Sequence, residues 1–292
     1  MSHFLENKSP LGQLVFLLLF VLGSALFFTL LGQVLGMLLF AKQTADQQPV
    51  FMMVEQMLMS TGIFLLPALL FARAMKGNWF SYNRANACPA KSHLYLVFFL
   101  SFVLLPVVSM LGYLNEQISL PAAWNDIEQW IKNMEEKIDQ ILMLLLSNHS
   151  PCNILLCMLT MAVVPAICEE FFFRGTLQPF FTRWFSGYSA AIWVTAFIFS
   201  AIHLQFAGFI PRFLLGVYLG YLYRWGGSLW LPVFAHFLHN AFSLGLWFYM
   251  DSVGMSTNTI SPTDFPSFIP LFAVAVLLLP CGLLLLYKKR IH

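Results

Sequence analysis

Long apolar stretches alternate with short polar segments along the whole chain. A helix that crosses a bilayer needs about 20 apolar residues, and by that rule we expect roughly eight spans. They are Leu11–Phe40, Phe51–Ala72, Leu94–Leu114, Ile154–Phe181, Ala190–His203, Phe209–Tyr223, Leu229–Tyr249 and Phe268–Tyr287. The fifth and sixth are short and interrupted by polar residues, which is typical of helices shielded inside a bundle. The pattern therefore predicts an all-α fold, a polytopic transmembrane helix bundle.

The segment between the third and fourth spans follows a different pattern, in which apolar residues recur at three- and four-residue steps among charged ones. These apolar residues are Trp124, Ile127, Trp130, Ile131, Met134, Ile138, Ile141, Leu142 and Leu145. The spacing predicts one amphipathic helix lying at the membrane interface, where tryptophan is favoured. Two roles stay open for it: guiding a substrate to a site, or simple anchoring at the interface.

Composition agrees with a membrane protein and excludes other classes. The 292 residues are 59% hydrophobic and only 10% charged, whereas soluble domains are about 25% charged. A net charge of +2 is too small to indicate a nucleic-acid partner. The five cysteines show no metal-binding spacing, and four of them lie in or beside apolar segments, where a free cysteine behaves as a small hydrophobe, so we interpret them as structural. We expect a single transmembrane domain over residues 1–292.

Basic residues predict the orientation in the membrane. Four of them, with no acid among them, follow the second predicted span, and three more stand at residues 288–290. The first group is Arg73, Lys76, Arg84 and Lys91. By the positive-inside rule both groups belong in the cytoplasm. We therefore expect a multi-pass protein of the cell (inner) membrane with both termini cytoplasmic and the lipid bilayer around it.

The fourth span contains charges that a lipid-facing helix does not tolerate. Two carboxylates, Glu169 and Glu170, and the guanidinium of Arg174 stand among apolar residues, and charge at membrane depth costs at least a few kcal/mol per group. On a helix Glu170 and Arg174 share one face, while Glu169 lies about 100° away. Either Glu170 and Arg174 neutralise each other and leave Glu169 for chemistry, or all three form a structural ion-pair cluster. Pro165 predicts a kink that frees a backbone carbonyl nearby.

Two further polar groups follow in later apolar segments. One is His203, four residues after Phe199; the other is the pair His236 and Asn240, also four residues apart. Each alone is typical of polar contacts between membrane helices. Together with Glu169 they supply a general base, two imidazoles and an amide donor, which is a set suited to hydrolysis.

These three ordered motifs, Glu169-Glu170-xxx-Arg174, Phe199-xxx-His203 and His236-xxx-Asn240, resemble those of the CPBP family. That family of intramembrane proteases includes type II CAAX prenyl endopeptidases and bacteriocin-processing or immunity proteins, and is also called Abi. The resemblance covers about a third of the chain and implies a catalytic core at residues 150–250. It implies that Glu169 activates a water, that Glu170 and Arg174 complete the first motif, and that His203 holds the water. It also implies that His236 and Asn240 stabilise the oxyanion.

Three functions are therefore weighed. The favoured one is an endopeptidase that cuts a membrane-bound protein or peptide. The alternatives are a non-catalytic scaffold or immunity protein of the same fold, and a transporter or proton relay, since buried ionisable chains also mark ion pathways. Internal repeats typical of many transporters are not evident.

Metal dependence is open from sequence. Glu169, His203 and His236 could form a His/His/carboxylate zinc site with one open position. A metal-free glutamate mechanism is the rival, and Asn240, a poor zinc ligand, favours it. The cofactor is therefore none or a divalent metal. Straight helices would also leave Glu169 and His203 at different depths, each about 25 Å from opposite membrane surfaces at 1.5 Å per residue.

Overall fold

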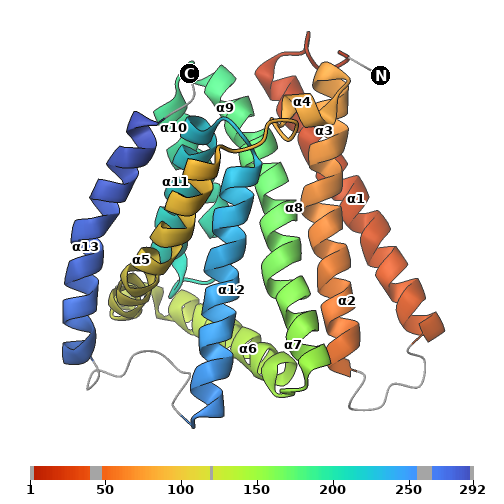
Figure 1. Ribbon diagram of the computed structural model, residues 1–292. Helices are drawn as coiled ribbons and strands as arrows, with labels where there is room; N and C mark the ends of the chain where they lie inside the picture. The colour runs from red at the N-terminus through yellow and green to blue at the C-terminus, as the bar shows by residue number, and fades with distance from the viewer. Residues whose placement is uncertain (1–2, 40–47, 119–120, 255–264, 290–292) are drawn as a thin grey trace.

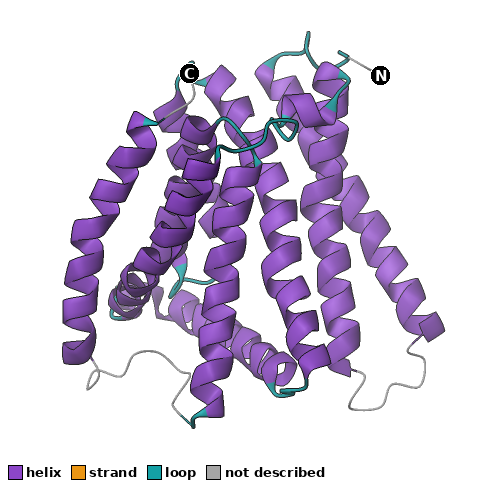
Figure 2. Cartoon of the chain, viewed as in Figure 1, coloured by secondary structure: helices purple, strands orange, loops and turns teal. Residues whose placement is uncertain are grey.

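The structure, a computed structural model, describes residues 3–39, 48–118, 121–254 and 265–289. Within these ranges the chain forms helices joined by short turns and contains no strand (Figure 2). The prediction of an all-α helix bundle is confirmed. Phe40, which ends the first predicted span, and Arg290 in the basic carboxyl end lie outside the described residues.

A helix or a run of helices corresponds to every predicted span (Figure 1). The first, third and last are α1 (Pro10–Leu39), α5 (Lys91–Glu116) and α13 (Phe265–Lys288). The second is a rod made of α2 (Gln48–Ser60), η1 (Thr61–Leu65) and α3 (Leu66–Lys76). The fourth is a rod made of α7 (Pro151–Met158), η3 (Leu159–Val163), α8 (Val164–Phe172), η4 (Phe173–Leu177) and α9 (Gln178–Trp184). The others are α10 (Tyr188–Ala201), α11 (Phe209–Gly226) and α12 (Trp230–Ser252).

Among the described residues, five helical rods are long and apolar enough to cross a membrane. They are Pro10–Leu38, Gln48–Lys76, Lys91–Glu116, Pro151–Trp184 and Pro270–Lys288. Helix α10 is shorter, with 14 residues. Helices α11 and α12 carry arginines, histidines and an asparagine, which suits helices packed inside the bundle.

Three turns in these rods, η1, η3 and η4, are π-helical, and each ends two residues before a proline. These prolines are Pro67, Pro165 and Pro179. Proline has no N–H and its ring clashes with the carbonyl four residues earlier, and a widened turn relieves that clash. A π-turn is therefore present directly before Pro165, where the sequence predicts a kink.

The predicted amphipathic helix is present as α6 (Asn125–Leu146), preceded by the 3-10 turn η2 (Ala122–Trp124). It runs across the end of the bundle remote from the two termini (Figure 1). Ile127 and Trp130 are exposed on it, while Leu145 is buried. The remaining short helix, α4 (Trp79–Tyr82), lies at the opposite end.

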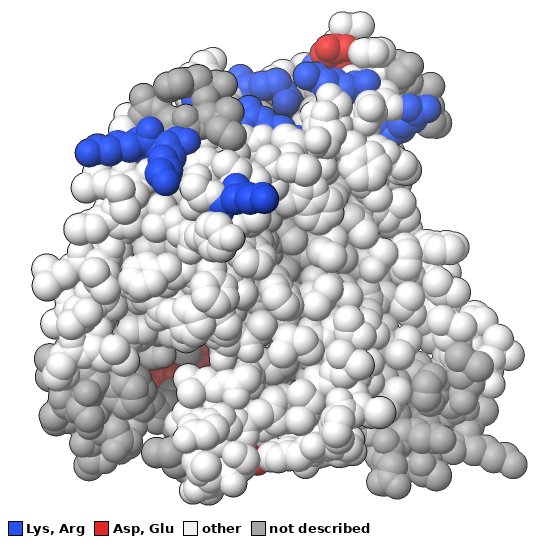
Figure 3. Space-filling view, viewed as in Figure 1, with Lys and Arg blue, Asp and Glu red and all other residues white. Residues whose placement is uncertain are grey.

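Lysines and arginines gather at the end of the molecule that carries both termini (Figure 3). Nε2 of His93, at the start of α5, lies 3.1 Å from the backbone oxygen of Lys289, so the two basic groups predicted to share a face do so. The assignment of this face to the cytoplasm stays a prediction.

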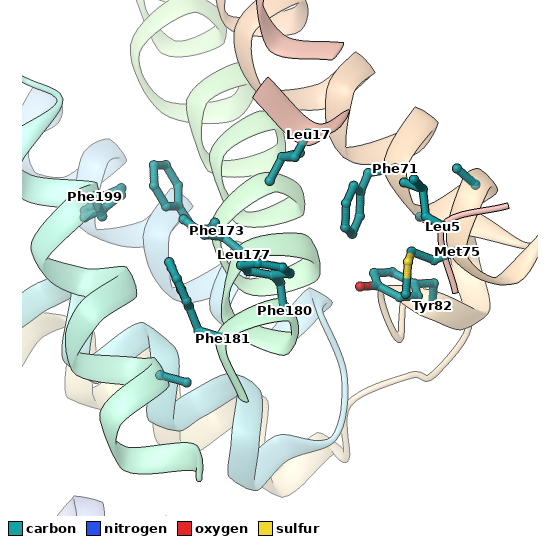
Figure 4. Packing of buried hydrophobic residues seen from close by; sticks show 13 residues of the cluster. Leu5, Leu17, Phe71, Met75, Tyr82, Phe173, Leu177, Phe180, Phe181 and Phe199 are labelled. Atoms are coloured by element: carbon teal, nitrogen blue, oxygen red, sulfur yellow. The ribbon is translucent and has the colours of Figure 1, made fainter. Parts of the chain in front are cut away.

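Aromatic packing and small residues bring the motif-bearing helices together. A core cluster extends from Phe71 and Phe180 to Phe173 and Phe199, joining α3, the α7–α9 rod and α10 (Figure 4). Gly216 on α11 allows close approach to α10, because a Cβ there would lie 3.0 Å from the Cβ of Ala196. Such small-residue contacts are typical of membrane helix pairs.

Candidate active site

The first motif is organised around one fully buried oxygen. Oε1 of Glu170, on α8, accepts a hydrogen bond from Nη1 of Arg174 at 2.6 Å and lies 2.8 Å from Nδ1 of His236 on α12. The Glu170 and Arg174 side chains are both 0% exposed. A carboxylate facing a guanidinium only accepts, so Nδ1 of His236 carries the proton of this contact. The ion pair expected from the four-residue spacing is present.

Arg174 also connects this centre to a third helix. Its Nη2 donates to the backbone oxygen of Gly216 on α11 at 3.0 Å. One turn later, Nε2 of Gln178 donates to the backbone oxygen of Gly220 at 3.1 Å. Two side chains four residues apart therefore reach two carbonyls four residues apart, and this match fixes the register of α11 against the η4–α9 part of the rod.

Glu169 occupies a different environment from its neighbour. Its Oε2 lies 4.0 Å from Nε2 of His236, and within the described part of the chain its carboxylate accepts no hydrogen bond. The residue is 9% exposed, whereas Glu170 is 0% exposed. His236 thus stands between the two carboxylates, with one ring nitrogen toward each.

His203 follows α10, in the short connection before α11. Its Nδ1 lies 2.8 Å from the backbone oxygen of Phe199. The Phe199 ring is 5.4 Å from the His203 ring and 5.9 Å from the His236 ring, and the Arg174 guanidinium lies 4.7 Å from its centroid. The Phe199 ring therefore packs against residues of all three motifs. Sequence reasoning missed this role, although Phe199 is part of the second motif.

The expected difference in depth between Glu169 and His203 is resolved by helix length. The rod that carries Glu169 has 34 residues, so Glu169 lies near its middle. Helix α10 has only 14 residues, so the chain turns back inside the bundle directly after it. His203 is thereby placed beside Phe199 and His236 rather than at a surface.

Asn240 faces the π-turn that Pro165 imposes. Its Nδ2 donates to the backbone oxygen of Met161 at 3.2 Å. Met161 is four residues before Pro165, so its oxygen lacks the usual helical donor. The carbonyl predicted to be freed by Pro165 is therefore used to hold the amide of Asn240, and this amide retains a second N–H.

The connection that carries His203 is held from two other helices, a feature that sequence reasoning missed. Asn115, at the end of α5, donates from Nδ2 to the Phe206 oxygen at 2.7 Å and accepts from the Ile210 N–H at 2.9 Å. Oε1 of Glu135, on α6, accepts from the Ala207 N–H at 2.9 Å. In the sequence, only the polar Asn115 at the end of an apolar span could have indicated this contact. Helix α6 is thus hydrogen-bonded directly to the connection that carries His203.

Arg212 is a further charged residue near the site that the motifs did not include. Its Nη2 donates to Oε1 of Gln205 at 2.7 Å, and its Nη1 is buried without a hydrogen-bond partner among the described residues. The guanidinium interacts electrostatically with both Glu169 and Glu135. In the sequence, Arg212 stands out as a lone cation in a short apolar span, and this position could have indicated a role near the site.

The set of Glu169, His203 and His236 was considered as a zinc site. In the described ranges, no three His, Cys, Asp or Glu side chains are arranged to hold a metal ion. Nδ1 of His236 is engaged by Glu170, and its Nε2 faces Glu169 across 4.0 Å. These residues as arranged do not form a ligand set, so we derive no step through a metal, and the cofactor prediction stays untested.

Residues 151–242 match the family described as Type II CAAX prenyl endopeptidase Rce1-like. The match covers 92 of the 292 residues. The resemblance stated on the three motifs is thereby confirmed, since all the motif residues lie inside the matched range. The Rce1-like segment begins with α7 and ends within α12, and the division of the chain into domains stays a prediction.

A curated relative of the chain is the "Uncharacterized protein YpbD" of Bacillus subtilis (strain 168). The two are 32% identical over 80 residues, which is 26% of this chain and 38% of the relative. The match thus spans well under half of that protein. No solved structure matches the chain. The family that residues 151–242 match is one of CAAX prenyl endopeptidases.

Proposed function

We propose that the chain is an intramembrane endopeptidase that hydrolyses a peptide bond of a membrane-associated protein or peptide. The observation that carries the proposal is the unequal pairing of two adjacent carboxylates. Glu170 is occupied by Arg174 and His236, whereas Glu169 accepts no hydrogen bond from the described residues. A carboxylate left unpaired beside an imidazole is suited to take a proton from water.

In the proposed reaction Glu169 accepts a proton from a water whose oxygen attacks the peptide carbonyl carbon. The C–O bond forms and the carbonyl electrons move to the oxygen as an oxyanion. When the oxyanion collapses, the C–N bond breaks, and the proton held by Glu169 passes to the leaving amine. Carboxylate and amine products account for all atoms of the water.

His203 and Asn240 have suitable donors and acceptors for the other roles. The Phe199 carbonyl only accepts, so Nδ1 of His203 carries a proton and Nε2 is free to accept a hydrogen bond from the water. Asn240 has one N–H on Met161 and a second for the oxyanion. His236 donates from Nε2 to the oxyanion when its ring is an imidazolium.

The test compares the protein termini in membranes of cells that contain wild type or Glu169→Gln at equal abundance. Glu128→Gln is the matched control, because Glu128 is a carboxylate on α6 that pairs with Lys132. We expect new termini with wild type and Glu128→Gln and none with Glu169→Gln. Identical termini with a folded Glu169→Gln protein would refute the role of Glu169.

A further inference from the structure

A basic cavity opens at the end of the molecule that carries both termini, away from the motif residues. It has a volume of about 390 Å³ and lies among α3, α4, α9 and the ends of α10 and α11. Four cations line it: Lys76, Arg84, Arg183 and Arg224. Figure 3 shows basic side chains gathered at this end.

The cations of this cavity have no carboxylate partner in the part of the chain that the structure describes. Within the described residues, none of the four forms an ion pair with Asp or Glu. The acid that lines the cavity, Glu6, is paired with His3 instead. Four positive charges against one negative charge leave an excess that attracts an anion.

Tyrosines hold the three arginines in place. The Arg84 guanidinium lies 5.4 Å from the Tyr223 ring, and that of Arg224 lies 4.0 Å from the Tyr188 ring. A guanidinium stacked on an aromatic ring is fixed in direction and still presents its N–H groups at the edge.

The third arginine brings a hydroxyl with it. Nη2 of Arg183 donates to the Tyr82 hydroxyl oxygen at 2.9 Å. Burial raises the pKa of the Tyr82 phenol. The hydroxyl therefore keeps its proton and has a donor to offer to an anionic oxygen.

The backbone at Arg84 adds a separate indication. Its φ is 55°, in the left-handed region that non-glycine residues rarely adopt. The Arg84 carbonyl accepts from the Leu229 N–H at 3.2 Å, which helps to hold this conformation. Residues kept in such conformations cluster at binding sites.

We propose that this cavity binds a phosphate ester through the three arginines, Lys76 and the Tyr82 hydroxyl. A guanidinium group binds phosphate oxygens through bidentate hydrogen bonds, and several arginines that line one cavity can bind one phosphate together. The phosphate belongs to an anionic phospholipid headgroup or to a soluble phosphorylated molecule. Basic cavities between membrane helices at the cytoplasmic surface are known sites for such headgroups. The proposal does not depend on the proposed protease activity.

The test measures the thermal unfolding of the full-length protein in a neutral detergent at constant ionic strength. Short-chain phosphatidylglycerol, phosphatidylcholine and glycerol 3-phosphate are titrated separately. The variant is Arg183→Gln with Arg224→Gln. The control is Lys91→Gln with Lys288→Gln, which removes two charges at the same end of the molecule outside the cavity.

We expect phosphatidylglycerol to raise the Tm of wild type and control, and the cavity variant to need at least tenfold more lipid. If glycerol 3-phosphate gives the same pattern, the site is confirmed and the ligand is soluble. Equal loss in both double variants, or no rise in Tm with either phosphate, would overturn the proposal. Arg183→Lys keeps the charge but loses the planar donor. It should fold and need a lipid concentration between those of wild type and the cavity variant to raise its Tm.

Discussion

Nδ1 of His236 lies 2.8 Å from Oε1 of Glu170, and this contact joins α12 to α8 at the centre of the bundle. The same oxygen accepts a hydrogen bond from Arg174, so Glu170 is engaged by two groups, whereas Glu169 accepts no hydrogen bond from the described residues. Adjacent carboxylates in one sequence motif thus have different environments, and they are expected to respond differently to mutation.

Glu170→Gln is expected to lower stability, whereas Glu169→Gln is not. Removing the Glu170 charge leaves the fully buried Arg174 without its partner, and breaking such a pair destabilises by about 3–5 kcal/mol. Thermal unfolding of the two purified variants checks this directly. An equal Tm for both would mean that the two carboxylates share the structural role.

Asn240→Ala is expected to reduce turnover by about 100- to 1,000-fold, the range for losing one oxyanion donor. The fold should be little affected, because a single hydrogen bond between membrane helices contributes about 0.6 kcal/mol. Cleavage rate and Tm are measured together. A large fall in Tm with no change in rate would assign Asn240 to structure alone.

Pro165→Ala tests the hydrogen bond from Asn240 to the Met161 carbonyl by changing the acceptor's surroundings. Alanine restores an N–H that competes with Asn240 for the Met161 carbonyl. We expect the rate to fall while Asn240 itself is intact, and Pro67→Ala, at the equivalent position after η1, serves as the control. An unchanged rate in Pro165→Ala would show that the Met161 contact does not position the amide.

Glu135→Ala is expected to lower kcat/KM by about tenfold or more, because a small displacement of a catalytic group has effects of that size. The substitution removes the acceptor of the Ala207 N–H and loosens the connection that carries His203. Glu135→Gln retains an acceptor oxygen and should restore activity. Glu136→Ala, its exposed neighbour on α6, is the control and should behave as wild type.

Asp139 on α6 predicts a dependence of stability on pH. Partial desolvation of this largely exposed side chain, with a smaller contribution from Glu135, raises the pKa of Asp139 above its ordinary value of 3.8. The folded protein therefore holds this proton more tightly than the unfolded chain, and the stability gained below pH 3.8 is lost as pH rises through the folded-state value. Asp139→Asn should have a higher Tm than wild type at about pH 7.5, and the difference should vanish near about pH 4.

The sequence by itself determined the fold class and the identity of the motif residues. Runs of apolar residues dictate helices because a bilayer offers no partner for backbone N–H and C=O groups. The four-residue spacing of Glu170 and Arg174 dictated their ion pair, since helical geometry places such residues on one face. Pro165 dictated a freed carbonyl because proline has no N–H to donate.

Only the tertiary structure decided which groups meet across helices. The contact of His236 with Glu170, the choice of Asn240 as donor to Met161 and the proximity of Arg212 depend on helix register and on the short α10. The four cations of the basic cavity are also brought together from positions up to 148 residues apart, Lys76 to Arg224. Local spacing specifies the face of a helix, but packing against the other helices determines its partner, and that information is spread over the whole chain.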